Sequence, residues 1–336
     1  MNRKAILSIG VLLCAAVLVL AVIWGLKLIP GGFAHADSYT AGNAEITAQV
    51  KNLDIEWTSG KIVFATHSGS TVLLNETCDK PLAEDEKMQW WLDGNTLRVR
   101  YEKPAIRLFS AGKKKVLTVT LPEGIALDDA RISATSADMS IPLLRAENLT
   151  VNITSGNVNA VAAARKANVG STSGDITLIL TGPVESLIAG STSGSLDLTV
   201  SEAGKVAASS TSGAVSLKGT KCGDVDLGST SGNVYVEVEE AGHIVLHSTS
   251  GSIRVSAGKF ASLKSDSTSG SVQAFLPAEP GFTARLSTTS GRVEYTLPLT
   301  KQGGSYICGD GSARVDIGTT SGSITVKDIA ESIGIR

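Results

Sequence analysis

Few residues in this chain combine the type and the spacing that chemistry requires. His247 and Asp266 stand 19 residues apart, in equivalent outward positions of a repeat described below, where they could touch. A His–Asp pair can form half of a nucleophilic triad, but on the surface of a β-ladder it is more often without a catalytic role, and no serine in a nucleophile-elbow setting accompanies it. His243 has no obvious metal partner beyond His247. We therefore predict no catalytic residue, no metal and no cofactor.

The most regular spacing belongs to the tripeptide Thr-Ser-Gly, which occurs nine times between Thr154 and Ser323. Successive glycines are separated by 18, 20, 19, 19, 19, 19, 21 and 31 residues. The nine are Gly156, Gly174, Gly194, Gly213, Gly232, Gly251, Gly270, Gly291 and Gly322. A period near 19 predicts one supersecondary unit stacked on copies of itself. We interpret the glycines as structural corners whose backbone needs positive φ.

Apolar residues keep fixed offsets from each glycine. Two residues after it stand Val158, Ile176, Leu196, Val215, Val234, Ile253, Val272, Val293 and Ile324. Four residues after it stand Ala160, Leu178, Leu198, Leu217, Val236, Val255, Ala274, Tyr295 and Val326. An offset of two between largely β-branched residues is the strand period. Each unit therefore reads as strand, corner, strand and turn.

About 19 residues are too few for two strands and a crossover helix, so we predict an all-β, single-stacked β-solenoid, or parallel β-helix, of about 19-residue coils. Strand parity predicts that Ser229 and Ser231 face the interior corner, while Thr230 between them faces out. The outward column, a hydroxyl ladder or alternatively a binding stripe, includes Thr172, Thr192, Thr211, Thr230, Thr249 and Thr268.

The amino terminus predicts export of the rest of the chain. Residues Ala5–Leu26 carry no charge over 22 residues and follow Arg3 and Lys4. This pattern favours a single transmembrane helix with the C-terminal body extracytoplasmic, and hence a cell-membrane location. A cleaved signal peptide ending at Ala34-His35-Ala36 is the alternative.

The predicted organisation has six parts. They are a cytoplasmic stub at 1–4, the membrane anchor at 5–29, a spacer at 30–43, irregular coils and a cap at 44–138, the regular solenoid at 139–330, and a tail at 331–336. In the irregular part, Thr58-Ser59-Gly60 and Thr135-Ser136-Ala137-Asp138 look like an early corner and a degenerate one. The insertion Lys301–Gly311 lengthens one coil and is read as a tolerated loop, with partner contact as the alternative.

Composition limits the partners. The formal net charge is −2 and aromatic residues make up 4% of the chain, so we expect no nucleic acid and no stacking platform. The one short basic run, Lys113-Lys114-Lys115, reads as a solvated turn. The pairing of Cys78 cannot be read from the sequence, whereas Cys222 and Cys308 should lie too many coils apart for a disulfide.

Glycan-cleaving β-helices need clustered carboxylates or an Arg/Lys pair on one outer face. The position six before each glycine holds Asn168, Ile188, Ala207, Asp226, Val245, Lys264, Arg285 and Asp316, with no patch of one sign. The position after each glycine is equally varied, which argues against a repeated calcium loop.

The segments Asp54–Phe64 and Val116–Gly124, followed by the serial Thr-Ser-Gly units, resemble the putative adhesin family of bacterial surface proteins (domain of unknown function 4097, DUF4097). The resemblance implies a membrane-anchored β-solenoid, in some members linked to cell-envelope stress, and no catalytic residues. We expect a non-enzymatic surface protein that binds an envelope protein or a cell-surface polymer. The alternative is a polysaccharide-cleaving β-helix enzyme, either a lyase or a hydrolase.

Overall fold

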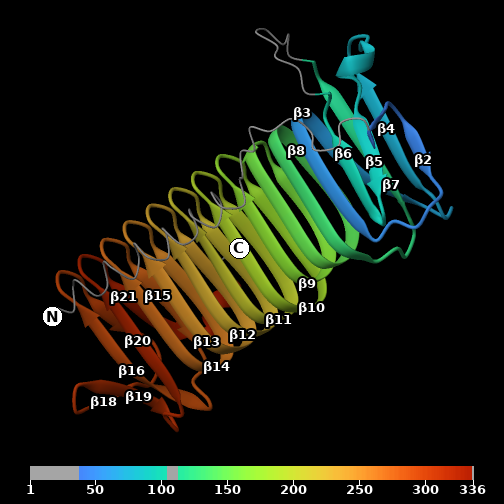
Figure 1. Ribbon diagram of the computed structural model, residues 1–336. Helices are drawn as coiled ribbons and strands as arrows, with labels where there is room; N and C mark the ends of the chain where they lie inside the picture. The colour runs from blue at the N-terminus through green and yellow to red at the C-terminus, as the bar shows by residue number, and fades with distance from the viewer. Residues whose placement is uncertain (1–37, 104–112, 335–336) are drawn as a thin grey trace. The chain divides into compact units, whose positions relative to one another are not determined.

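The computed structural model describes residues 38–103 and 113–334, and within them the fold is all-β, a solenoid-like sheet of mainly parallel stacked strands (Figure 1). The predicted fold class is confirmed at this level. Helical segments such as η2 (Glu84–Glu86) and η3 (Ile329–Gly334) are short 3-10 turns. Over the described residues, no helix is both long and apolar enough to cross a membrane. The predicted anchor at Ala5–Leu26 lies outside them.

Chain contacts divide the described residues into two compact units, with the boundary between Thr181 and Gly182, inside strand β10 (Ile176–Ser191). The N-terminal unit contains β1 (Thr40–Ala41), β2 (Ala44–Ile46), β3 (Asn52–His67), β4 (Val72–Cys78), β5 (Gln89–Asp93), β6 (Thr96–Arg100), β7 (Lys115–Pro122), β8 (Leu127–Ser155) and β9 (Val158–Ser171). The C-terminal unit contains β11 (Leu196–Ser210), β12 (Val215–Ser229), β13 (Val234–Ser248), β14 (Ile253–Ser267), β15 (Val272–Leu276), β16 (Gly281–Thr288), β17 (Val293–Tyr295), β18 (Thr300–Gln302), β19 (Ser305–Gly309), β20 (Ala313–Thr319) and β21 (Ile324–Asp328).

Strands β11 to β14 form the regular coils, each pairing in parallel with the next at a constant offset of 19 residues. Within β12 the buried side chains are Val215, Leu217, Cys222, Val225, Leu227 and Ser229. Burial alternates with the strand period at both ends but changes phase between Leu217 and Val225. The chain therefore bends there, and the two halves of each coil face a common core.

The predicted apolar columns are confirmed in every coil except that of Gly291. There Val293 is only half-buried and Tyr295 is 44% exposed. This coil is the exception because it lies at an edge of the unit: β17 pairs with β21 on one side, and no partner on its other side occurs in the described part of the chain.

The coils at this end do not stack in sequence order. This corrects the prediction that each coil stacks on the one that precedes it in the chain. Strand β20 pairs in parallel with both β14 and β16, and β21 pairs with both β15 and β17. The coil of Gly322, last in the chain, therefore lies between the coils of Gly270 and Gly291. The predicted loop Lys301–Gly311 is instead the β18–β19 hairpin, in which β19 pairs antiparallel with the first half of β16 (Figure 1).

The N-terminal unit has the same non-consecutive order. Strand β3 pairs in parallel with β8 on one side, and with β6 and β7 on the other. Strands β5 and β4 then pair antiparallel with β6 and β7 and cover that edge. We call β1, β2 and β4–β7 the N-terminal cap. The predicted early corner is confirmed, because Gly60 pairs with Ala137, and Ala137 lies against Gly156.

Candidate interaction surface and the corner that builds it

A single buried serine organises the corners of the regular coils. In the coil of Gly232, the Ser229 Oγ accepts a hydrogen bond from the Gly232 N–H at 2.8 Å and donates to the Gly213 carbonyl at 3.0 Å. Ser210 does the same with Gly213 and Gly194, at 2.9 and 3.0 Å. The first bond closes the turn within a coil and the second joins two coils. The buried hydroxyl is thus fully used by the backbone.

The corner glycines are required by close stacking rather than by φ. Among the nine, positive φ occurs at Gly156 (115°), whereas Gly213, Gly232 and Gly251 lie outside that region. A Cβ built on Gly232 would overlap the carbonyl oxygen of Gly213 in the neighbouring coil. The same collision occurs at Gly174, Gly213, Gly251, Gly270, Gly291 and Gly322. The positive-φ interpretation was therefore wrong for most of these corners.

The surface of each corner carries two hydroxyl residues instead of the predicted one. Thr230 is half-buried at the surface, as expected, but Ser231 is exposed, which contradicts its predicted inward position. Strand alternation ends at Ser229, and the next three residues form a bend in which parity no longer applies. We call the paired columns the corner stripe: Thr192, Thr211, Thr230, Thr249 and Thr268 with Ser193, Ser212, Ser231, Ser250 and Ser269.

Backbone bonds continue through the corner stripe. The Thr230 N–H donates to the Ser210 carbonyl at 3.2 Å, and the Ser231 N–H donates to the Thr211 carbonyl at 3.0 Å. Equivalent bonds hold the next two coils. The stripe is therefore a rigid array, with neighbouring coils at the interstrand spacing of about 4.8 Å.

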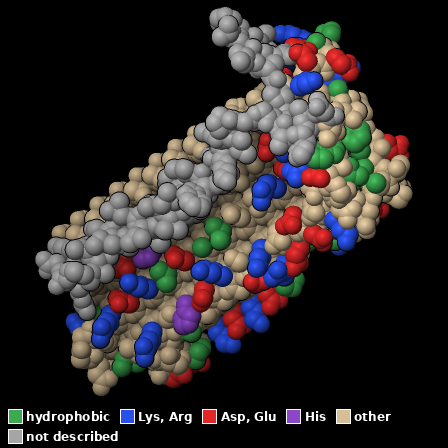
Figure 2. Space-filling view, viewed as in Figure 1, with side chains coloured by type: hydrophobic (Ala, Val, Ile, Leu, Met, Phe, Trp, Pro, Cys, Tyr) green, Lys and Arg blue, Asp and Glu red, His purple; other side chains and the backbone are tan. Residues whose placement is uncertain are grey.

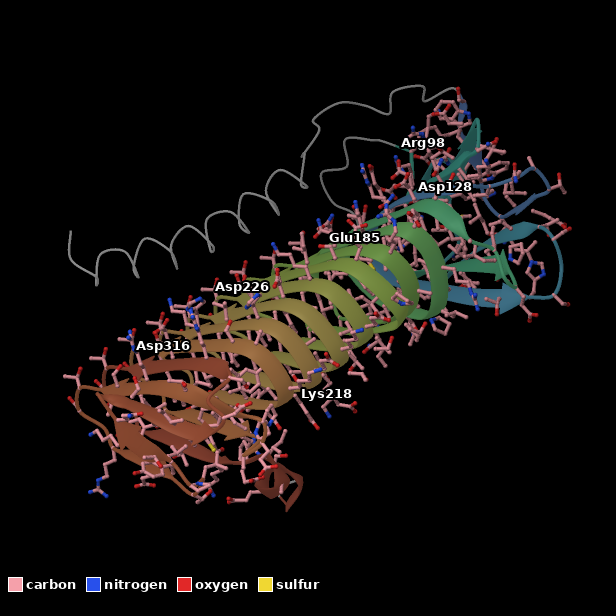
Figure 3. The ribbon with its side chains drawn as sticks, turned by 90° about the horizontal axis from the view of Figure 1, so that it is seen from below. Arg98, Asp128, Glu185, Lys218, Asp226 and Asp316 are labelled. Carbon is pink, nitrogen blue, oxygen red and sulfur yellow. The ribbon has the colours of Figure 1, made fainter. Side chains whose placement is uncertain are left out.

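Outside the corners, the regular coils carry alternating charges. The register places Glu202, Lys221, Glu240 and Lys259 in one outward column, and the Lys259 Nζ lies 3.3 Å from the Glu240 Oε1. Figure 2 shows acidic and basic side chains interspersed along this unit. Exposed Asp226 and Lys218 project from different parts of the coil (Figure 3). Opposite charges on adjacent strands stabilise the register and leave no large field of one sign.

The predicted His–Asp neighbours lie side by side in the register, His247 opposite Asp266. The interaction found for the Asp266 carboxylate is with Lys264, at 3.5 Å. His243 instead has its Nδ1 2.8 Å from the Ser262 Oγ. No group of three or more metal-ligating side chains occurs in residues 38–103 and 113–334.

The N-terminal cap contains a buried ion pair. Lys115 is 1% exposed, and its Nζ lies 2.6 Å from the Oε1 of Glu76, which is 3% exposed. The ammonium also donates to the carbonyls of Glu86, at 2.8 Å, and Tyr101, and it lies over the rings of Tyr101 and Trp57. Burial lowers the pKa of Lys115, and the nearby Glu76 carboxylate acts in the opposite direction. The predicted solvated turn was wrong for Lys115.

Strand pairing explains why this lysine is internal. Lys115 lies opposite Cys78 in the antiparallel β4–β7 pair, and Glu76 lies opposite Leu117, so the two charged residues are diagonal neighbours. The alternation Lys115, Leu117, Val119 places the lysine on the inward face of β7. That alternation was visible in the sequence, and the run of three lysines concealed it.

Cys78, Cys222 and Cys308 are free thiols. Cys222 occupies the inward column between Ala203 and Ala241. Burial raises the pKa of its thiol to about 11. These cysteines therefore provide no cross-link within the described residues.

The family model of Toastrack DUF4097 matches residues 50–179 and 183–327. The chain belongs to the DUF4097 family. This confirms the resemblance drawn from the strand and corner motifs. No functionally curated protein matches the chain.

Solved structures with similarity to this DUF4097 chain include three from Parabacteroides distasonis and Bacteroides fragilis. A putative lipid binding protein from Parabacteroides distasonis is 15% identical, with 88% of this chain and 98% of that chain covered, at a TM-score of 0.42. A putative adhesin from the same organism is 12% identical, with 86% and 96% covered, at a TM-score of 0.38. A putative adhesin from Bacteroides fragilis is 13% identical, with the same coverage, at a TM-score of 0.27.

Proposed function

We propose that this protein is a non-enzymatic, adhesin-like binding protein of the cell envelope. In this proposal Ala5–Leu26 anchors it in the membrane, and the stacked coils lie outside the cell. Its partner is a cell-surface polymer or an envelope protein, and its contact surface is the corner stripe. The observation that carries the proposal is that the serines and most of the threonines of the stripe are exposed, while the backbone N–H groups of its corners from Thr211 to Ser269 donate to the neighbouring coil.

The structure supports binding through the outside of the coils. The inward columns hold packing residues, and the corner serines are occupied by backbone bonds. Outward groups, by contrast, repeat at the spacing of the coils. A rigid array of hydroxyls matches a polymer that itself repeats and carries hydroxyl groups, because each contact is pre-ordered before binding.

The proposal is tested by binding of the detergent-solubilised full chain to purified cell-wall glycan, lipid vesicles and envelope proteins. In the test variant Ser212, Ser231 and Ser250 are each replaced by arginine, which fills the stripe without reaching the core. We expect saturable binding by the wild type and at least tenfold weaker binding by the variant.

The matched control places three arginines at Lys218, Glu237 and Ser256. These residues share one outward column in the strands that follow the corner glycines. This control should bind like the wild type. Equal loss in both variants, or no saturable binding by the wild type, would refute the corner stripe as the contact surface. Cleavage of the glycan during incubation would instead favour the enzyme alternative.

A further inference from the structure

The coil of Gly291 ends the stack of the C-terminal unit beyond β20 and β21. Its strands β16 and β17 pair in parallel with β20 and β21 on one side. On the other side, β19 covers Gly281–Ala284 at the start of β16 (Figure 1), and nothing in the described part of the chain pairs with β17. We call Thr289–Tyr295, which comprises the corner and β17, the terminal edge.

Backbone groups of β17 point out of the stack. The Ile324 N–H of β21 donates to the Arg292 carbonyl at 2.8 Å, so this carbonyl points toward β21. In a trans peptide the next N–H points the opposite way, so the Val293 N–H is directed outward. The Thr296 N–H donates to β21 at 3.1 Å, and by the same reasoning the Tyr295 carbonyl is directed outward. The N–H and the carbonyl of one strand residue lie on the same edge, so Val293 and Tyr295 each offer a donor and an acceptor.

The corner adds a further acceptor. In the coils beneath, the Gly322 carbonyl accepts a hydrogen bond from the Thr288 Oγ1 at 2.8 Å, and the Gly270 carbonyl accepts one from the Thr319 Oγ1 at 3.0 Å. The Gly291 carbonyl is the equivalent group of the terminal edge, and none of the residues that the structure describes donates to it. A strand laid along the terminal edge would therefore complete the interactions that the coils make with one another.

Apolar surface lies beside these backbone groups. Val293 is half-buried and Tyr295 is 44% exposed, although the same columns are buried in the coils beneath. The ring of Tyr306, from the β18–β19 hairpin, packs edge-on against the Tyr295 ring with their centroids 5.6 Å apart. A partner strand would thus cover an aliphatic and an aromatic side chain in addition to the backbone.

The terminal edge is complementary to itself. If two copies pair antiparallel about a two-fold axis at Val293, the N–H of each Val293 meets the carbonyl of the other. The Tyr295 N–H then meets the Gly291 carbonyl of the second copy. In the same register the exposed Arg292 lies opposite the exposed Glu294 of the second copy. Because the two-fold axis repeats every contact, this charge pair forms twice.

Other arrangements lack this agreement. An axis at Glu294 sets two carboxylates opposite each other, which is destabilising, and an axis at Tyr295 sets Glu294 opposite Thr296. Parallel stacking of a second copy would need an uncovered parallel edge of the other kind. In the N-terminal unit, antiparallel β5 and β4 cover the parallel strands β6 and β7 beside β3. Charge and topology therefore both select the antiparallel pair centred on Val293.

We propose that the terminal edge is a dimerisation surface, through which two copies of this chain pair antiparallel across their β17 strands with Val293 at the two-fold axis. The interface is isologous, so it closes at two copies. It covers an edge that would otherwise be a template for nonspecific strand addition. It uses no residue of the corner stripe, so it stands apart from the contact surface proposed above.

The test is sedimentation of the detergent-solubilised full chain over a series of protein concentrations, which measures the monomer–dimer equilibrium. We expect a reversible dimer for the wild type. Arg292→Glu and Glu294→Arg each set like charges opposite each other twice, and each should raise the dissociation constant at least about tenfold. The double variant restores both pairs with their signs exchanged, so its dissociation constant should return to within about threefold of the wild-type value.

Lys218→Glu is the matched control, because it changes the charge of the chain as Arg292→Glu does, at an exposed position away from the terminal edge. Its dissociation constant should equal that of the wild type. A wild-type chain that stays monomeric at every concentration would overturn the proposal. So would a dimer that both single variants preserve, because another surface would then join the copies, or a double variant that fails to recover, because Arg292 and Glu294 would then not face each other.

Discussion

The regular coils and the N-terminal cap bury polar groups in two different ways. In the regular coils, a corner buries one neutral hydroxyl, and at Ser210 and Ser229 this hydroxyl bonds both to the backbone of its own coil and to that of the neighbouring coil. In the cap, one ammonium and one carboxylate are buried together under two aromatic rings. The buried hydroxyl of a coil is small and recurs in successive coils, whereas the buried ion pair is large and belongs to the cap.

The difference follows from what each region must achieve. A coil meets a copy of itself on both sides, so one hydroxyl with a donor and an acceptor function satisfies the geometry at every level. The cap joins parallel strands to antiparallel ones and has no neighbouring copy to imitate. A buried ion pair is costly unless its geometry is good, and it makes the cap depend on two particular residues.

The strongest test of this comparison breaks the ion pair. Glu76→Leu leaves Lys115 buried without its carboxylate and should lower the free energy of unfolding by about 3–5 kcal/mol. Adding Lys115→Met should recover most of that loss, because two apolar residues then replace the pair. Denaturation followed by fluorescence of Trp57, Trp90 and Trp91, which lie in or against the cap, measures both. Equal losses in the single and double variants would show that Lys115 is held by something other than Glu76.

The next test distinguishes two explanations of the corner glycines, close stacking of neighbouring coils and a positive φ. Gly232→Ala should lower the free energy of unfolding by about 3 kcal/mol, because the new Cβ overlaps the neighbouring coil. Gly94→Ala, in the cap, has φ of 60° and open space around a new Cβ, so about 1 kcal/mol is expected. Circular dichroism during denaturation gives both values. The reverse order would restore the positive-φ explanation of the corners.

A smaller effect distinguishes the two serines of one corner. Ser229→Ala removes a buried hydroxyl and leaves the Gly232 N–H and the Gly213 carbonyl unpaired, at a cost of about 2 kcal/mol. Ser231→Ala changes an exposed side chain and should alter stability by less than about 0.5 kcal/mol. Thermal unfolding of the two variants compares them directly. If Ser231→Ala were the more harmful, the inward assignment from strand parity would stand.

The smallest effect depends on pH. The folded-state pKa of Cys222 is about 11, above the value of 9.0 for an unburied thiol, so the folded state binds more protons between these values. Stability should therefore fall as pH rises above 9, by about 1 kcal/mol at pH 10. Cys222→Ala, which matches Ala203 and Ala241 in its column, should lose less over the same range. Parallel denaturation curves at pH 8 and pH 10 measure the difference, and identical losses would contradict it.

Periodicity made much of the coil structure predictable. The apolar columns and the inward Ser229 follow from an offset of two, which each coil repeats. The inward Ser231 was wrong because parity fails once the strand bends. The collision at Gly232 depends on a neighbouring coil and leaves no local signature in the sequence.

The stacking position of the last coil, formed by β20 and β21, and the burial of Lys115 were harder to predict, because both depend on which distant strands pair. One sequence signal was available for this last coil. Consecutive stacking would have placed Lys264 beside Arg285, two like charges on adjacent strands, and Asp316 removes that conflict. Charge order along an outward column therefore carries information about stacking order.

The coil of β20 and β21 is the last in the chain but stacks between two earlier coils, and this has a consequence for synthesis. The ribosome delivers the flanking strands, within residues 253–295, before Ala313, so they emerge while the coil that stacks between them is still being made. A message truncated before Ala313 would yield a product in which β14 with β15, and β16 with β17, lack the strand partners that β20 and β21 provide. Such edges are templates for aggregation, and quality-control proteases would have a ready feature by which to distinguish incomplete chains from finished ones.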